Sequence, residues 1–268
     1  MSQEHANDDH YQIEEAPLRR KPTLPGEVKV AENPEEANEM IARDLMNMAM
    51  MCASKFGAFH LALSGGHTPF PLYKQLMLDP QYRALPWRHT HLWIVDERRA
   101  PFDDDLNNFK HINEIIVHHA DIPPENVHPI PVDKGEEAAS IYEQELHETL
   151  ALRGGEEARL DFVMLGMGDN GHTASLFPHT SVLHERDHWV GDCKGPSVTP
   201  PDRVTMTYPL INNARQIAFF VLGEGKAEMI HRVATGRDSY EEIPVKAIAP
   251  TNGLLTWYLD VASAGGPG

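Results

Sequence analysis

One histidine stands in a glycine-rich segment that is suited to proton transfer. Gly166-Met-Gly-Asp-Asn-Gly-His172 follows an apolar run, so His172 is expected at the end of a strand. With a reference pKa of about 6.5, an imidazole can take a proton from water near neutral pH. The chain has 16 histidines, and the place of His172 between Gly171 and Thr173 at a strand end distinguishes it from the others.

A second segment and two basic residues are suited to holding an anion. Ser64-Gly-Gly-His-Thr-Pro69 joins a predicted strand to a predicted helix, and its glycines let the backbone approach a ligand. Thr68 is expected to cap that helix, whose free N–H groups would attract phosphate or carboxylate. Arg203 opens a later strand and Lys226 begins a later helix. A tight structural turn is the alternative explanation for the glycines.

Three other patterns in the sequence could have a chemical role. Asp96-Glu-Arg98 ends a predicted strand, with a solvated charge run as the alternative. Gly166-x-Gly-x-x-Gly171 matches a dinucleotide-binding fingerprint, which we reject because the segment that follows is too short for the required helix. The pairs His89-x-His91 and His118-His119 lack the partners and spacing of a zinc site, so no metal is expected.

These residues need a scaffold that brings several strand ends together. Apolar runs predict strands at 59–63, 91–95, 160–165, 203–207, 216–222, 245–248 and 254–259. Helical patterns begin at Asn33-Pro34 and cover about 106–119, 135–153 and 226–235. This alternation predicts a single Rossmann-like α/β domain with a mainly parallel sheet flanked by helices. Ligands of such sheets bind at the carboxyl ends of the strands, where the polar segments fall.

Composition sets the expected limits of the domain and its compartment. We expect a disordered polar leader at 1–26, the domain at 27–262 and a flexible tail at 263–268. Cys52 and Cys193 are too few for a disulfide framework, and they fit a reducing compartment. The cytoplasm is the predicted location, with the lumen of the endoplasmic reticulum left open. Since no apolar stretch approaches the ~20 residues that span a bilayer, no membrane is expected.

The charge balance constrains the partners. Lys and Arg number 23 against 40 Asp and Glu, which gives a net charge of −17 with neutral histidines. A surface this negative repels nucleic-acid backbones, so no nucleic acid is expected. A small phosphate can still be held locally by a helix N-terminus and two or three cations. The chain is expected to be a monomer or a weak homo-oligomer.

Several motifs in order, from about Val28 to Ala262, resemble one family. The motifs are Ser64–Pro69, Val95–Arg98, Asn107–Phe109, Leu165–Pro178, Arg203–Thr207, Pro209–Asn212, Gly225–Glu228 and Leu255–Asp260. They are similar to those of the 6-phosphogluconolactonases, within the sugar-phosphate isomerase/deaminase/lactonase superfamily. Other segments look most like the lactonase portion of the bifunctional hexose-6-phosphate dehydrogenase/lactonase.

The resemblance implies an activity and roles for residues. It implies a carboxylic ester hydrolase that needs no cofactor and converts 6-phospho-D-glucono-1,5-lactone to 6-phosphogluconate in the oxidative pentose phosphate pathway. His172 would be the general base, and Arg98 would face the lactone or the phosphate. Asn170 and Asp96 are the other candidate catalytic residues. The candidate residues for binding the phosphorylated substrate are Ser64, Gly65, Gly66, Thr68, Arg203 and Lys226.

Asn170 departs from the family pattern, which has Asp two residues before the histidine. Asn can orient an imidazole but supplies no charge, and it can select the wrong tautomer. Asp169 or Asp96 is the candidate source of the missing carboxylate. Two other functions stay open. One is a catalytically weak sugar-phosphate sensor, and the other is an amino-sugar-phosphate isomerase/deaminase, which would carry Glu where Phe177 stands.

Overall fold

A parallel sheet forms the centre of the computed structural model, which describes residues 21–152, 157–196 and 198–266. All six of its described strand pairs are parallel. The seven strands, in spatial order, are β1 (Glu27–Ala31), β10 (Leu254–Asp260), β9 (Gln216–Val221), β6 (Phe162–Leu165), β2 (Phe59–Leu63), β3 (Thr90–Ile94) and β5 (Val127–His128). The predicted mainly parallel α/β fold is confirmed.

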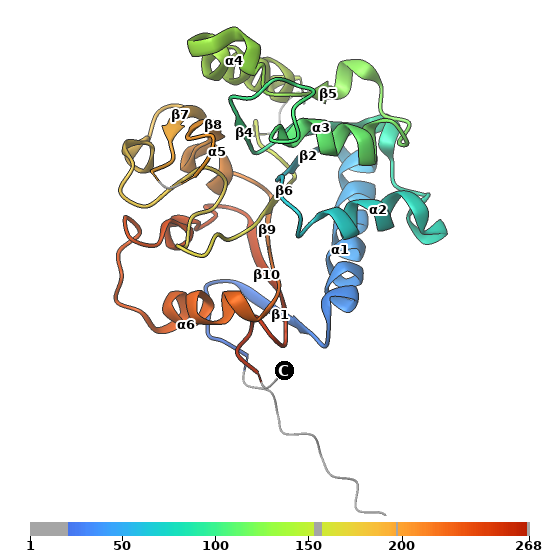
Figure 1. The fold of residues 1–268 in the computed structure, drawn as a ribbon. Coiled ribbons are helices and arrows are strands. Elements are labelled where there is room, and N and C mark those ends of the chain that lie inside the picture. Colours follow the sequence, from blue (N-terminus) through green and yellow to red (C-terminus); the bar gives the residue numbers. More distant parts are fainter. Residues whose placement is uncertain (1–20, 153–156, 197, 267–268) are drawn as a thin grey trace, which may run out of the picture.

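Helices cover both faces of this sheet. They are α1 (Pro34–Phe56), α2 (Phe70–Leu78), α3 (Asn108–Ile112), α4 (Ala138–Ala151), α5 (Tyr208–Asn212) and α6 (Ala227–Thr235). Figure 1 shows α1 and α2 on one side of the sheet, and α5 and α6 on the other. A π-helical turn at Asn113–Val117 continues α3. Short 3-10 helices cover Pro80–Tyr82, Trp87–His89, Pro124–Asn126, Val132–Glu137, Ser181–His184, Glu224–Lys226 and Pro244–Ala247.

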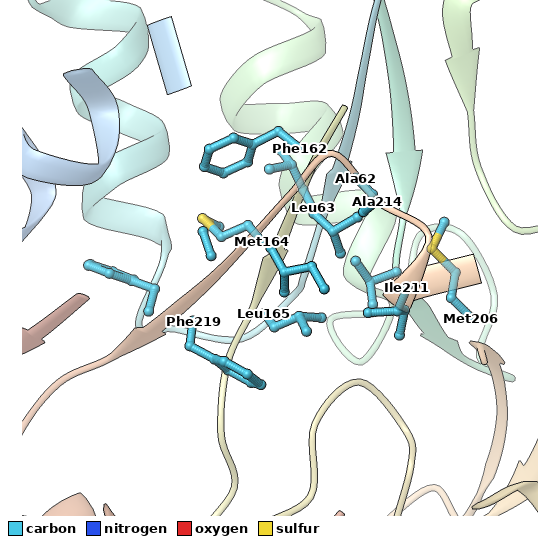
Figure 2. Packing of buried hydrophobic residues seen from close by; sticks show 14 of the residues in the cluster. Ala62, Leu63, Phe162, Met164, Leu165, Met206, Ile211, Ala214 and Phe219 are labelled. Atoms are coloured by element: carbon cyan, nitrogen blue, oxygen red, sulfur yellow. The ribbon is translucent and has the colours of Figure 1, made fainter. Parts of the chain in front are cut away.

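The central strands are nearly continuous apolar runs because they are covered on both sides. Every residue of β2, β6 and β9 is buried. Figure 2 shows Leu63 and Leu165 on the side of Ile211 of α5, and Phe162 and Met164 pointing to the opposite side of the sheet. Parallel strands with two covered faces are expected to show this composition, which is why these strands were predictable from sequence.

A second sheet of three antiparallel strands was not predicted. It contains β4 (Asp96–Arg98), β8 (Asp202–Met206) and β7 (Val190–Lys194), with β8 in the middle. The short β4 consists of three charged residues directly after Val95, so it carries no hydrophobic period that would reveal a strand. In its register with β8, Arg98 lies directly opposite Arg203.

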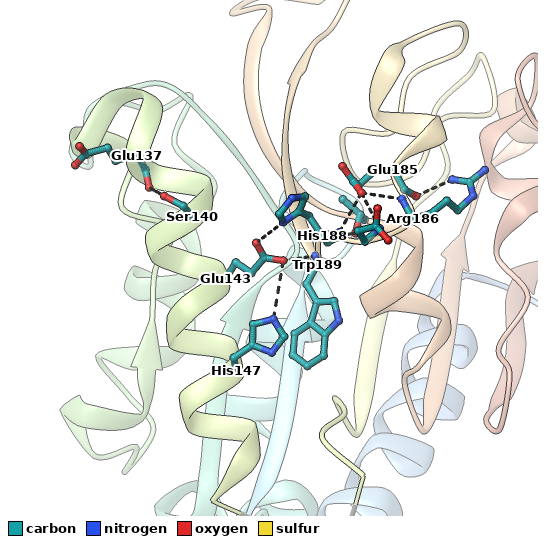
Figure 3. Close-up of polar contacts among 10 residues, drawn as sticks. Glu137, Ser140, Glu143, His147, Glu185, Arg186, His188 and Trp189 are labelled. Atoms are coloured by element: carbon teal, nitrogen blue, oxygen red, sulfur yellow. Dashed lines mark hydrogen bonds and ion pairs between the residues drawn. The ribbon is translucent and has the colours of Figure 1, made fainter.

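Helix α4 is fastened to this second sheet by polar contacts (Figure 3). Glu143 of α4 accepts the main-chain N–H of Trp189, and its other oxygen lies 3.0 Å from Nδ1 of His188. This carboxylate raises the pKa of the exposed His188. The His147 ring stacks on Trp189 with their centroids 3.8 Å apart. These contacts hold α4 against β7, the neighbour of the strand β8 that carries Arg203.

Two local predictions were wrong. The predicted strand at 245–248 is the 3-10 helix Pro244–Ala247, because Pro244 has no N–H for a strand ladder and readily begins a helical turn. Thr68 does not cap α2, which begins at Phe70 after Pro69 in helical conformation and has no side-chain cap. The N-cap predicted at Asn33 is confirmed, since its side chain accepts the N–H of Glu36 at 2.9 Å.

The ends of the predicted domain are described only in part. Residues 1–20 of the predicted leader and residues 267–268 of the predicted tail lie outside the described residues. Leu24 is buried, and Trp257 Nε1 donates to the carbonyl of Pro25 at 2.9 Å. Ser263 is also buried, and its hydroxyl donates to Val221. The domain limits stay a prediction. Within the described ranges, no helix is long and apolar enough to cross a membrane.

Candidate active site

A cavity of about 370 Å³ opens beyond the carboxyl ends of β2, β6 and β9. It collects side chains from segments that are far apart in the sequence, as the parallel topology requires. The predicted site residues in its lining are Ser64, Gly65, Gly66, Thr68, Asp96, Arg98, His172, Arg203 and Lys226. Asn170 is an exposed residue outside this lining, and it contacts His172.

Asn170 fixes the protonation pattern of the His172 ring. Its Oδ1 atom lies 3.2 Å from the main-chain N of His172 and 2.6 Å from the ring Nδ1. The main-chain N–H can only donate, so the amide atom facing it must be the oxygen. An oxygen accepts, and therefore Nδ1 carries the ring proton and donates it to Asn170. The neutral imidazole then has a lone pair on Nε2, so Asn170 favours the tautomer that can act as a base.

The surroundings of His172 keep its ring neutral. Burial lowers the pKa of His172, and the charges of Lys226 and Arg203 lower it further. Asp96 and Asp169 act in the opposite direction. The Phe177 ring packs against the imidazole with its centroid 4.6 Å away. At neutral pH the arrangement therefore offers an unprotonated base beside the cavity.

The two carboxylates considered as a substitute for the family Asp differ in position. Asp169 is largely exposed and forms an ion pair with Lys226, whose hydrogen bond lowers the pKa of Asp169. Asp96 is 7% exposed, lines the cavity and accepts the hydroxyl of Ser175 at 2.7 Å. Among the charges that act on His172, Asp96 has the largest effect on its pKa. Asp96 is thus the carboxylate better placed to stabilise a protonated His172.

Two arginines concentrate positive charge on one wall. Arg98 and Arg203 are directly opposite each other on antiparallel strands, where like charges are destabilising. Arg203 is only 6% exposed, and burial, followed by the charge of Arg98, lowers its pKa, while Asp96 opposes this. Hydrogen bonds to main-chain carbonyls orient both, from Arg203 Nε to Pro200 and from Arg98 Nη1 to Leu106. An anion between these guanidinium groups would relieve the repulsion.

The turn after β2 presents its backbone to the same cavity. Ser64 holds it in place, because its hydroxyl donates to Met164 and its carbonyl accepts the hydroxyl of Tyr73. Among the described residues, the N–H groups of Gly65 and Gly66 donate to no main-chain acceptor. Gly66 has a φ of +96°, a conformation that favours glycine. The turn therefore leaves main-chain donors available to an anion, and the Ser64 proton is already in use.

Some residues of the site were not predicted from sequence. Asn108 lines the cavity and donates from Nδ2 to the Asp96 carbonyl at 2.7 Å. Ser175 and Phe177 also line it, where they contact Asp96 and His172. Asn108 and Phe177 stood within motifs of the family resemblance, but nothing in their local sequence indicates these contacts. The solvated charge run considered for Asp96-Glu-Arg98 is wrong, because Glu97 is 0% exposed.

The segment from Gly166 to Gly171, which matches a dinucleotide-binding fingerprint, is not directly followed by a helix. The described residues after Gly171 make turns and a bridge between Thr173 and Leu176 where a dinucleotide site would need a helix. In the described part of the chain, no three His, Cys, Asp or Glu side chains gather closely enough to hold a metal ion.

The fold and the site define an α/β protein with a histidine and two arginines around a cavity at the carboxyl edge of its sheet. A family model described as glucosamine-6-phosphate isomerases/6-phosphogluconolactonase matches residues 32–257. The chain therefore belongs to this family, and the resemblance seen in the sequence is confirmed.

Relatives within the family are similar over most of this chain. It is 36% identical over 233 residues to the human GDH/6PGL endoplasmic bifunctional protein, a match that covers 84% of this chain. The chain spans only 28% of the length of that protein and of its rabbit counterpart. It is 37% identical to the 6-phosphogluconolactonase of Synechocystis, with 75% of this chain and 81% of that protein covered. The solved 6-phosphogluconolactonase of Thermotoga maritima has a TM-score of 0.74 at 25% identity, with 87% of this chain and 99% of that chain covered.

The room for the His172 ring depends on the absence of a side chain at Gly168. A Cβ atom there would lie 2.0 Å from both Nδ1 and Cε1 of His172. We expect Gly168→Ala to displace the ring from Asn170 and towards solvent, so that the pKa of His172 rises from its lowered value to near 6.5, about the unperturbed value. NMR titration of the histidine ring signals measures this shift. Gly225→Ala, with nothing within 4 Å of the added Cβ, is the matched control. An unchanged pKa in a folded Gly168→Ala protein would contradict the assigned packing.

Proposed function

We propose that this protein hydrolyses 6-phospho-D-glucono-1,5-lactone to 6-phosphogluconate, the second step of the oxidative pentose phosphate pathway. Membership of the family and the relatives named 6-phosphogluconolactonase support the activity. The observation that carries the mechanism is the contact of Asn170 Oδ1 with His172 Nδ1, which leaves Nε2 as an unprotonated base beside the cavity. No cofactor is needed for such a hydrolysis.

In the proposed mechanism His172 activates water. Its Nε2 takes a proton as the water oxygen bonds to the lactone carbonyl carbon, and negative charge develops on the carbonyl oxygen. The carbon–oxygen bond of the ring then breaks, and the imidazolium returns the proton to the departing ring oxygen. Asp96 stabilises the transient positive charge on His172, a task that Asn170 cannot perform. Asn170 keeps the ring oriented throughout.

The phosphate of the substrate would be held at the cationic wall. We assign Arg203 and Lys226 to the phosphate, together with the main-chain N–H groups of Gly65 and Gly66. Arg98 joins them, since it lies opposite Arg203 and a dianion can be shared by both guanidinium groups. The remote phosphate would thereby position the lactone carbon for attack, as binding energy away from the reacting bond often does.

The alternatives are less well supported. An isomerase/deaminase would need a carboxylate at the position of Phe177, whose buried ring packs against His172. A sensor without catalysis was suggested by Asn170, but the Asn170 contact favours the basic tautomer. For the compartment we propose the cytoplasm, since two cysteines are too few for the disulfide framework that is typical of an oxidising environment. The endoplasmic reticulum is the alternative.

The first prediction concerns the base. Wild-type protein should hydrolyse freshly generated 6-phosphogluconolactone well above the rate of a buffer blank. His172→Ala should lower kcat about a hundredfold to ten-thousandfold, the range of a general base. Because only the neutral ring is active and its pKa is lowered, wild-type kcat/KM should be constant above about pH 7 and fall in acid, below the ordinary imidazole pKa.

Initial rates from about pH 5 to 8, a range that spans the ordinary imidazole pKa, measure these effects once spontaneous hydrolysis is subtracted. Thermal unfolding of His172→Ala is the control for folding. A folded wild-type protein no faster than the blank favours the sensor, whereas full turnover by His172→Ala refutes the assignment of the base.

The second prediction concerns the phosphate. Arg203→Ala and Lys226→Ala should each raise KM for the phosphorylated lactone about tenfold to a hundredfold, which is the loss expected for a charged hydrogen bond. Neither should change hydrolysis of unphosphorylated glucono-1,5-lactone to the same degree. Parallel steady-state assays with the two lactones measure the difference. Equal losses with both substrates would argue against the phosphate role.

A further inference from the structure

Glu97 is a wholly buried carboxylate beside the cavity that none of the steps above uses. It is 0% exposed and lies between Asp96 and Arg98 on β4. Three main-chain N–H groups donate to it. Those of Arg98 and Asn108 reach Oε1 at 2.7 Å each, and that of Phe109 reaches Oε2 at 2.8 Å. The carboxylate thus ties β4 to the start of α3, across the loop between them.

This tie holds a guanidinium group that faces the cavity. Successive side chains of a strand point in opposite directions, so Asp96 and Arg98 share one face of β4 while Glu97 points to the other. Asp96 and Arg98 accordingly line the cavity, and Glu97 does not. The hydrogen bond from the N–H of Arg98 to Glu97 fixes the backbone from which the guanidinium group extends.

The same tie reaches the glycine turn through Asn108. Its amide donates to the Asp96 carbonyl, and its buried Oδ1 has no hydrogen-bond partner among the residues that the structure describes. A Cβ atom on Gly65 would lie 1.9 Å from this oxygen, so the amide packs directly on the turn. Movement of α3 would therefore move the side chain against which Gly65, and with it the turn, is packed.

The environment indicates that Glu97 is there for its geometry rather than for its charge. Burial raises its pKa to about 7, Asp96 adds to this effect, and the three N–H bonds only partly oppose it. A group held for its charge would be placed where ionisation is favourable. What Glu97 provides is a pair of oxygen acceptors, fixed in space, for donors from two elements.

We propose that Glu97 is a positioning residue that sets the affinity of the site for phosphate, because it holds Arg98 and, through Asn108, the Gly65–Gly66 turn. This inference rests on the proposed function, in which these elements bind the phosphate of the substrate. Glu97 itself does not contact the substrate.

The test is Glu97→Gln, which keeps the size of the side chain and replaces one acceptor with a donor. One main-chain N–H then faces an NH₂ group, and the start of α3 must move. We expect KM for 6-phosphogluconolactone and Kd for inorganic phosphate each to rise about tenfold. This is comparable to the loss of one hydrogen bond between the phosphate and the site. The value of kcat at saturation should stay within about twofold, since His172 is held by other contacts.

A matched control separates positioning from stability. Asp161 is also a wholly buried carboxylate, and it accepts the main-chain N–H of His60 at 2.8 Å, but it lies outside the cavity lining. Asp161→Asn should lower Tm and leave KM and the phosphate Kd unchanged. Partial unfolding lowers the active fraction and hence the apparent kcat, but it does not raise KM.

The outcomes distinguish the two proposals. An inactive wild-type protein would remove the lactonase function, and the phosphate Kd of wild type and Glu97→Gln would still test the positioning. An active wild type with unchanged KM and phosphate Kd in Glu97→Gln overturns the inference. Should Glu97→Gln fail to fold, Glu97→Asp provides the test, because its shorter side chain cannot reach the donors of both β4 and α3. Unchanged constants in that variant would also overturn the inference.

Discussion

The chemistry of this site depends on one amide oxygen that receives two hydrogen bonds. Asn170 Oδ1 accepts both the main-chain N–H and the ring Nδ1–H of His172. The main-chain donor identifies the oxygen, and the oxygen in turn fixes the tautomer. The rest of the loop serves this contact, since Gly168 leaves room for the ring and Gly171 has a φ of +76° that turns the chain back. This neutral amide orients the imidazole that we propose as the base, and a charged partner for the protonated ring must come from another residue.

In the proposed mechanism, Asn170 orients the ring of His172 and Asp96 stabilises its positive charge, so that no acid is needed two residues before the histidine. Orientation needs a nearby acceptor, whereas stabilisation of an imidazolium needs only a charge within several ångströms. Asp96, on β4 of the second sheet and far in sequence from the loop that carries His172, meets the second requirement. The positive charges of the site are also concentrated in one place. A chain with a net charge of −17 gathers Arg98, Arg203 and Lys226 at one cavity.

The strands that are buried on both faces could be predicted from the sequence, because their burial is visible as a local run of apolar residues. The strands at 59–63, 216–222 and 254–259 are continuous apolar runs, and each lies in the parallel sheet. The second sheet escaped prediction because β4 consists of charged residues, whose burial depends on partners distant in the sequence. For the same reason the burial of Glu97 could not be predicted. Its neighbours in the sequence are charged, as in a surface segment, but in the fold three main-chain N–H groups donate to its buried carboxylate. His172, Arg203 and Lys226 were accessible to prediction because they follow or begin recognisable elements.

The central claim, that Asn170 holds the Nδ1–H tautomer and leaves Nε2 as the base, can be tested directly by ¹⁵N NMR of the histidine rings. At about pH 8 the neutral ring of His172 should show a protonated Nδ1 and an unprotonated Nε2, since its lowered pKa lies well below that pH. The His172→Ala protein assigns the signals. A ring that carries its proton on Nε2 would contradict both the assigned contact and the proposed role of His172 as the base.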